Sequence, residues 1–162
     1  MELQGSCHCR AIRFSLQSHT PYPFMTCYCS ICRKTQGGSG GSVNIMGEKG
    51  SLRVQGDEHL SIYRARIEMP GGRIEESPGQ RHFCSLCGSA LWMWDPRWPA
   101  LVHPFASAID TPLPIPPERV HIMLNFKPDW VEVPDKPCNR HFSEYPEESI
   151  EEWHRTRGLW RD

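Results

Sequence analysis

The chain has 162 residues and a net charge of −1, from 18 Lys and Arg against 19 Asp and Glu. This length predicts one domain, 1–162, with its own core. The balanced charge gives no support to a nucleic-acid partner, and no apolar run reaches the eighteen residues that a membrane span needs. Hydrophobic content of 38%, 15 prolines and 13 glycines predict a loop-rich, mainly β chain in which metal supplies part of the cohesion.

The N-terminus gives no sign of export. Its first twenty residues contain two cysteines, two arginines and no continuous apolar stretch, so they do not read as a signal peptide. We therefore expect a cytoplasmic protein whose thiols stay reduced. Eight cysteines in such a compartment favour metal binding over disulfides, which remain the less favoured alternative.

The N-terminal segment predicts a strand over residues 11–16. Ile12, Phe14 and Leu16 alternate with more polar residues, and this period places the three side chains on one face. Cys7 and Cys9 stand two apart just before it. In an extended backbone both thiols point to the same side, so one metal ion can take both.

Further short strands are expected between turn signals. A glycine-rich stretch, 37–41, reads as a connection between strands, or alternatively as the wall of a ligand site. The proline-rich stretch 96–117 predicts loop with one short strand. The predicted strands are 25–27, 42–46, 51–55, 59–64, 73–76, 91–94, 101–106 and 121–126.

The C-terminal stretch, 146–160, is the one helix that the sequence predicts. Ser149 and Glu152 have the spacing of a capping box, and Gly158 follows the last basic turn. Ile150 and Trp153 lie on one helical face, which we expect to pack on a sheet.

Seven of the eight cysteines fall into three clusters with the spacing of metal ligands. A structural zinc site takes four ligands, whereas a catalytic site keeps three and an open position. A structural metal is most useful when it links segments that are far apart in sequence. Cys7 and Cys9 with Cys84 and Cys87 are therefore the predicted structural zinc site. Cys27, Cys29 and Cys32 then form the second zinc site, with Cys29 and Cys32 in a tight knuckle turn.

Other allocations remain open at this point. Cys7 and Cys9 could pair with Cys29 and Cys32, although this leaves an odd set of thiols. A histidine could close the middle site, the candidates being His8, His82, His103 and His121. Cys138 is isolated, and its surroundings predict a free thiol.

These motifs resemble a known family. GSCHC and AIRF within 5–14, CYCSICRK at 27–34 and FCSLCGSALW at 83–92 are similar to the glutathione-dependent formaldehyde-activating enzymes, a family that also includes centromere protein V. The stretch from Lys127 to Trp130 and the final helix resemble that family's ending. One departure is Arg10, where the family usually has glycine.

The resemblance implies a fold and an activity for the chain as a single zinc-binding domain of this family. The fold is a β-tent of antiparallel sheets stapled by zinc, with a short C-terminal helix. The activity joins glutathione to formaldehyde as S-hydroxymethylglutathione, classed with the carbon–sulfur lyases. The family also implies a structural zinc on the first and last cysteine pairs, and a reaction centre at Cys27, Cys29 and Cys32.

The expected substrates are therefore a thiol such as glutathione and a small aldehyde. An open zinc position stabilises a thiolate at neutral pH, and Arg33 and Lys34 beside it can meet the carboxylates of glutathione. A solvated basic pair is the alternative for these two residues. For the whole chain, the alternative is a non-catalytic zinc-binding module that binds proteins. The sequence leaves a homo-oligomer open.

Overall fold

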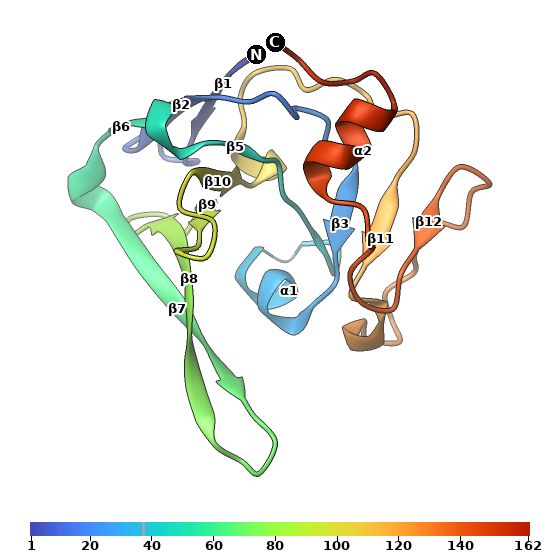
Figure 1. Ribbon diagram of the computed structural model, residues 1–162. Coiled ribbons are helices and arrows are strands. Elements are labelled where there is room, and N and C mark those ends of the chain that lie inside the picture. The colour runs from blue at the N-terminus through green and yellow to red at the C-terminus, as the bar shows by residue number, and fades with distance from the viewer. Residues whose placement is uncertain (37) are drawn as a thin grey trace.

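The structure is a computed structural model that describes residues 1–36 and 38–162, and it is mainly β. The strands of the described residues form three sheets, and two short α-helices pack among them (Figure 1). The two ends of the chain lie side by side at one edge of the molecule. Among the described residues, no helix is long and apolar enough to cross a lipid bilayer.

The first sheet is antiparallel and has three strands, β1 (Glu2–Ser6), β2 (Arg13–Gln17) and β6 (Arg53–Gln55), in the order β1-β2-β6. The strand predicted over 11–16 is confirmed as β2, with its apolar residues buried. Strand β1 did not emerge from the pattern, since Leu3 is its one large apolar residue.

The second sheet is antiparallel and has five strands in the order β5-β10-β9-β8-β7. Strands β7 and β8 extend well beyond the predicted 59–64 and 73–76, and their hairpin projects away from the rest of the molecule (Figure 1). The projecting part is mostly exposed, so its side chains lack the alternation that marks a half-buried strand. The strands are β5 (Gly47–Glu48), β10 (Leu101–Pro104), β9 (Ala90–Trp94), β8 (Ile74–Cys84) and β7 (Leu60–Glu68).

The third sheet is mixed, in the order β12-β11-β3-β4. Strand β11 (Val120–Ile122) runs parallel to both β3 (Met25–Cys27) and β12 (Arg140–His141), whereas β4 (Ser42–Val43) is antiparallel to β3. The prediction of antiparallel sheets thus holds for the first two sheets but not for this one. The strand predicted over 121–126 ends early, because the chain turns at Met123, which has a φ of 62°.

Short 3-10 turns connect several strands. They lie at Lys49–Ser51, Asp57–His59, Ala106–Ala108 and Leu124–Phe126. The predicted glycine-rich loop is a connection over residues 38–41, while Gly37 lies outside the described residues.

The predicted C-terminal helix is confirmed as α2 (Ile150–Thr156). The backbone N–H of Glu152 donates to Ser149 Oγ at 3.1 Å, and the N–H of Ser149 donates back to the Glu152 carboxylate at 2.8 Å, which completes the capping box. Trp153 stacks on Phe24, just before β3, with ring centroids 3.8 Å apart. It also shares a buried core with Val120 and Ile122 of β11, so the predicted apolar face does pack on a sheet.

A second helix, α1 (Ser30–Gln36), replaces the simple turn predicted around Cys32. Its sequence, SICRKTQ, has two β-branched residues and no acidic first turn, so its intrinsic preference for helix is weak. Burial of Cys32 in the core beneath the third sheet holds the helix instead.

The buried residues form two cores, and each contains part of one cysteine group. The first core joins the three-stranded and five-stranded sheets and includes Cys7 and Cys84. The second lies between the mixed sheet and α2, and includes Cys27 and Cys32. Each set of thiols is therefore fixed by a packed core on one side.

Candidate metal and active sites

Four thiols converge where the first two sheets meet. The Sγ atoms of Cys7, Cys9, Cys84 and Cys87 all lie within 4.8 Å of one another. Cys7 Sγ is 3.5 Å from Cys9 Sγ, which is 3.8 Å from Cys84 Sγ. Four thiolates around a zinc at the usual Zn–S length stand about 3.8 Å apart, so the donor set fits a closed tetrahedral site.

The turn that carries Cys7 and Cys9 differs from the prediction. These residues do not lie in an extended backbone but in the tight turn between β1 and β2, which the N–H of Arg10 closes on the Cys7 carbonyl at 2.9 Å. Arg10 takes a left-handed φ of 61°. The N–H of Ile12 donates to Cys7 Sγ at 3.2 Å, and this hydrogen bond orients the sulfur within the turn.

The second pair lies at the end of β8. Gly88 has a φ of 74°, and its N–H donates to the Cys84 carbonyl at 2.8 Å, as expected for the turn that closes a zinc knuckle. Ser89 Oγ lies 3.2 Å from Cys87 Sγ, and this hydrogen bond leads the effects that lower the pKa of Cys87 to about 5. The four-cysteine group thus joins the β1–β2 hairpin to the five-stranded sheet.

The other three thiols form a separate group. Cys27 ends β3, Cys29 precedes α1 and Cys32 lies within it, and their Sγ atoms lie within 4.8 Å of one another. The alternative in which Cys7 and Cys9 share a site with Cys29 and Cys32 is therefore wrong. Cys138 is exposed and belongs to neither group.

Hydrogen bonding within the three-cysteine group favours the thiolate form of Cys29. The thiols of Cys27 and Cys32 donate to it and lower its pKa to about 2, and the N–H of Cys32 adds a bond of 3.4 Å. The same contact with Cys29, together with burial, raises the pKa of Cys27. Three thiolates are stable together only beside a compensating cation, so this donor set fits a divalent metal ion.

No histidine joins either cysteine group in the described part of the chain. His121 is engaged through both ring nitrogens, by Tyr28 Oη at 3.0 Å and Asn139 Nδ2 at 3.4 Å. Burial lowers the pKa values of His82 and His103 to about 4. The three-cysteine group therefore has three protein donors, which leaves a position for an exchangeable ligand.

Two basic residues follow Cys32 on α1, as predicted. Lys34 is exposed, whereas the Nε atom of Arg33 is buried and has no hydrogen-bond partner among residues 1–36 and 38–162. The structure adds Arg81, on β8. The hydrogen bond from Cys27 lowers the pKa of Cys32, but the contact with Cys29 and burial raise it, and the net result is a pKa of about 11. The positive charge of Arg81 lowers the pKa of Cys32, so Arg81 lies close enough to act on this thiol.

Tyr145 is a second group near the three thiols that the sequence did not indicate. Tyr145 is largely exposed. Partial desolvation raises the pKa of its hydroxyl, and the nearby three-cysteine group raises it further. It comes from the segment between β12 and α2, more than a hundred residues from these cysteines in sequence. No sequence motif marks Tyr145, and only the fold brings it near the three thiols.

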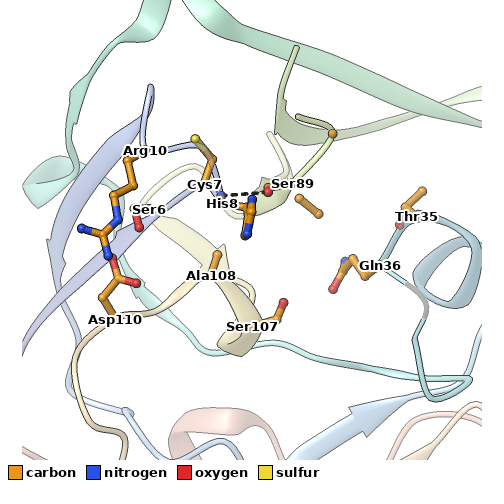
Figure 2. Close-up of a pocket in the computed structure, with 12 residues that line it drawn as sticks. Ser6, Cys7, His8, Arg10, Thr35, Gln36, Ser89, Ser107, Ala108 and Asp110 are labelled. Atoms are coloured by element: carbon orange, nitrogen blue, oxygen red, sulfur yellow. Dashed lines mark hydrogen bonds between the residues drawn. The ribbon is translucent and has the colours of Figure 1, made fainter. Parts of the chain in front are cut away.

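A polar pocket lies between the Cys7–Cys9 turn and the C-terminal end of α1 (Figure 2). Its volume is about 510 Å³. Residues from four distant segments line it, among them Ser6, His8, Arg10, Thr35, Gln36, Ser89, Ser107 and Asp110. The pocket therefore reaches from one cysteine group to the helix that carries part of the other.

The proline-rich stretch is part of the fold, as the predicted short strand is β10, which lies between β5 and β9. It begins beside Asp95, whose side chain is 2% exposed and accepts from Arg97 Nε at 2.9 Å and Nη2 at 2.6 Å. These hydrogen bonds lower the pKa of Asp95.

We expect Asp95→Asn to lower the free energy of unfolding by about 1–2 kcal/mol at pH 7. Since the folded pKa of Asp95 is lowered, its contribution is present above the unfolded pKa and is lost as pH falls through the folded value. The difference in free energy of unfolding between variant and wild type, measured by urea melts, should thus become smaller below about pH 4. Glu75→Gln, at the exposed Arg73–Glu75 pair, is the control and should leave stability unchanged. A gap that is constant with pH would contradict the assignment.

Comparisons with known proteins agree with this arrangement. The family model for glutathione-dependent formaldehyde-activating enzymes matches residues 2–125, which include all seven clustered cysteines. A protein of Halomonas elongata named as a putative enzyme of this kind is 60% identical over 159 residues, 98% of each chain. A crystal structure of a Rhodobacter sphaeroides protein shares the fold, with a TM-score of 0.52 and 22% identity over 70% of this chain and 92% of that one. The chain therefore belongs to the glutathione-dependent formaldehyde-activating enzyme family.

Proposed function

We propose that this chain catalyses the reversible addition of glutathione, or a similar thiol, to formaldehyde or another small aldehyde, in the manner of a carbon–sulfur lyase. The observation that carries the proposal is the three-cysteine group, with three thiol donors and no histidine among the described residues to complete it. The 60% identity to the Halomonas elongata protein supports the choice of substrates.

The two cysteine groups have different roles in this proposal. Cys7, Cys9, Cys84 and Cys87 hold a structural zinc that staples the sheets into the β-tent expected for the family. Cys27, Cys29 and Cys32 hold a second zinc, which when bound would lower the pKa of an incoming thiol and stabilise its thiolate at neutral pH.

In the reaction, the thiolate sulfur attacks the aldehyde carbon. A C–S bond forms, the π bond of the carbonyl breaks, and the oxygen takes up one proton to give the hydroxymethyl group. Arg33, Lys34 and Arg81 supply positive charge close to the three thiols and favour binding of the anionic thiol. The hydroxyl of Tyr145 is a candidate source of the proton.

The remaining parts of the proposal follow from the chemistry. Residues 1–162 act as one catalytic domain, and the thiol-dependent reaction suits the reducing cytoplasm. The substrates are small molecules, with no role for nucleic acid or a membrane.

The proposal is tested by measuring adduct formation with the zinc-loaded protein. We expect the protein to accelerate the appearance of S-hydroxymethylglutathione from glutathione and ¹³C-formaldehyde, followed by exchange NMR since the uncatalysed reaction also proceeds. The rate should fall to the background value after the metal is removed and return when zinc is restored. Exchange at the background rate with the fully zinc-loaded protein would leave the alternative, a non-catalytic binding module.

A further inference from the structure

The polar pocket between the Cys7–Cys9 turn and α1 has no role in the chemistry described so far. Two charged residues of opposite sign line it, Arg10 and Asp110, and Figure 2 places both side chains on the same side of the pocket. Neither forms an ion pair within the part of the chain that the structure describes. Both charges are therefore available to a ligand.

The backbone gives no reason for an arginine at position 10. Its φ of 61° lies in the left-handed region, which glycine adopts freely and a residue with a Cβ adopts at a cost. The turn itself needs only the N–H of residue 10, which bonds to the Cys7 carbonyl. Strain of this kind persists where the side chain has a use, and the Arg10 side chain lines the pocket.

The other lining groups are hydrogen-bonding ones. Ser6 lies beside the charged pair, whereas Ser107 lies nearer to Gln36, which lines the pocket from the end of α1 (Figure 2). Gln36 Nε2 is buried and finds no hydrogen-bond partner among the described residues. The amide oxygen of Gln36 accepts a hydrogen bond from Ser42 Oγ, so only the nitrogen is unpaired among these residues. A buried N–H donor without a partner is costly, and this one also favours a polar ligand.

A cation and an anion on one side of a pocket match the carboxylate and ammonium of an α-amino-acid group. Glutathione has one such group, at its γ-glutamyl end, several bonds from the sulfur. Helix α1 covers the first part of this interval, because Cys32 and Gln36 are four residues apart, about 6 Å along the helix axis. The pocket covers the rest, since Arg10 and Asp110 lie across it from Gln36 (Figure 2). A thiol at the three-cysteine group can thus extend along α1 into the pocket.

We propose that this pocket binds the α-amino-acid group of the thiol substrate, with Arg10 binding its carboxylate and Asp110 its ammonium. This assignment rests on the proposed function, since it takes glutathione as the substrate. It makes Arg10 and Asp110 specificity residues that select γ-glutamyl thiols.

The test is calorimetric titration of the zinc-loaded protein with S-methylglutathione, which has no free thiol. Loss of one charge-assisted contact should raise Kd about tenfold or more in Arg10→Gly and in Asp110→Asn. S-methyl-cysteinylglycine, which lacks the γ-glutamyl group, should bind wild type weakly and be insensitive to Arg10→Gly. Thermal melts of Arg10→Gly should show an unchanged Tm or a rise of up to about 4 °C, because glycine relieves the strained φ.

This combination separates binding from folding. A purely structural Arg10 would give a lower Tm on substitution, and its loss would leave Kd unchanged. Arg66→Gln, on the projecting hairpin, removes the same charge away from the pocket and should leave Kd within twofold.

Equal Kd values for wild type, Arg10→Gly and Asp110→Asn would overturn the assignment, and so would an absence of binding to wild type. The proposed function is judged separately, by the exchange measurement. If the protein accelerates adduct formation but Arg10→Gly leaves the Kd for S-methylglutathione unchanged, only the pocket assignment is wrong. If binding of S-methylglutathione depends on Arg10 but the protein does not accelerate adduct formation, only the proposed catalytic function is wrong.

Discussion

Replacing Cys29 by serine is expected to reduce the catalysed rate of adduct formation by at least about 10³-fold, since a catalytic metal supplies several kcal/mol of transition-state stabilisation. Cys29 accepts hydrogen bonds from the other two thiols of the three-cysteine group, and these lower its pKa. A serine hydroxyl stays protonated at neutral pH and is a poor zinc ligand. Adduct formation followed by exchange NMR gives the rate, and metal analysis should show the loss of about one zinc per chain.

The matched control for this variant is Cys138→Ser, which removes an exposed thiol outside both groups. It should retain the rate and the zinc content of the wild type. Cys29 is half-buried, so its serine variant should also keep most of its thermal stability. Full activity in Cys29→Ser with one zinc missing would contradict the assignment of the reaction centre to this group.

The second large effect is expected at the four-cysteine group. Cys87 is exposed, so replacing it by serine alters almost no packing. If the group holds a structural zinc, the variant should still lose at least about 5 kcal/mol of stability, or about 10–20 °C in Tm, because metal-binding energy is then folding energy. Chelation of the wild-type protein should produce a similar fall.

Two variants sharpen this test. Cys9→Ser, at the other exposed thiol of the group, should match Cys87→Ser, since both remove one ligand and neither creates a cavity. Cys138→Ser should leave the Tm unchanged. A change of only a degree or two in both ligand variants would show that packing of the first core, with Cys7 and Cys84 in it, is sufficient to hold the two sheets together.

The cysteine groups could be predicted because the spacing of the cysteines limits which thiols can lie together. Pairs two or three residues apart present their thiols together in any tight turn, so the grouping survived an error in the local backbone at Cys7 and Cys9, which lie in a turn and not in an extended strand. The C-terminal helix was predictable for a similar reason, since Ser149 and Glu152 form a local capping box.

Features that depend on long-range packing were missed. Helix α1 has a weak local signal and forms where Cys32 is buried against the second core. Tyr145 and Asp110 come from loops whose sequence neighbourhoods contain no motif. Arg81 comes just before the FCSLCGSALW motif, but nothing in that motif indicates that Arg81 lies near the other cysteine group. Strand β11 ends at Ile122 although the apolar pattern continues to 126, because Met123 turns the chain.

The measurement that tests the central claim most directly is the zinc content of the purified, reduced protein, before and after glutathione is added. We predict close to two zinc ions per chain, with one of them changing its coordination or becoming exchangeable when glutathione binds. The Cys29→Ser protein should contain one, indifferent to glutathione. A wild type with a single tightly held zinc that does not respond to glutathione would contradict a reaction centre at Cys27, Cys29 and Cys32.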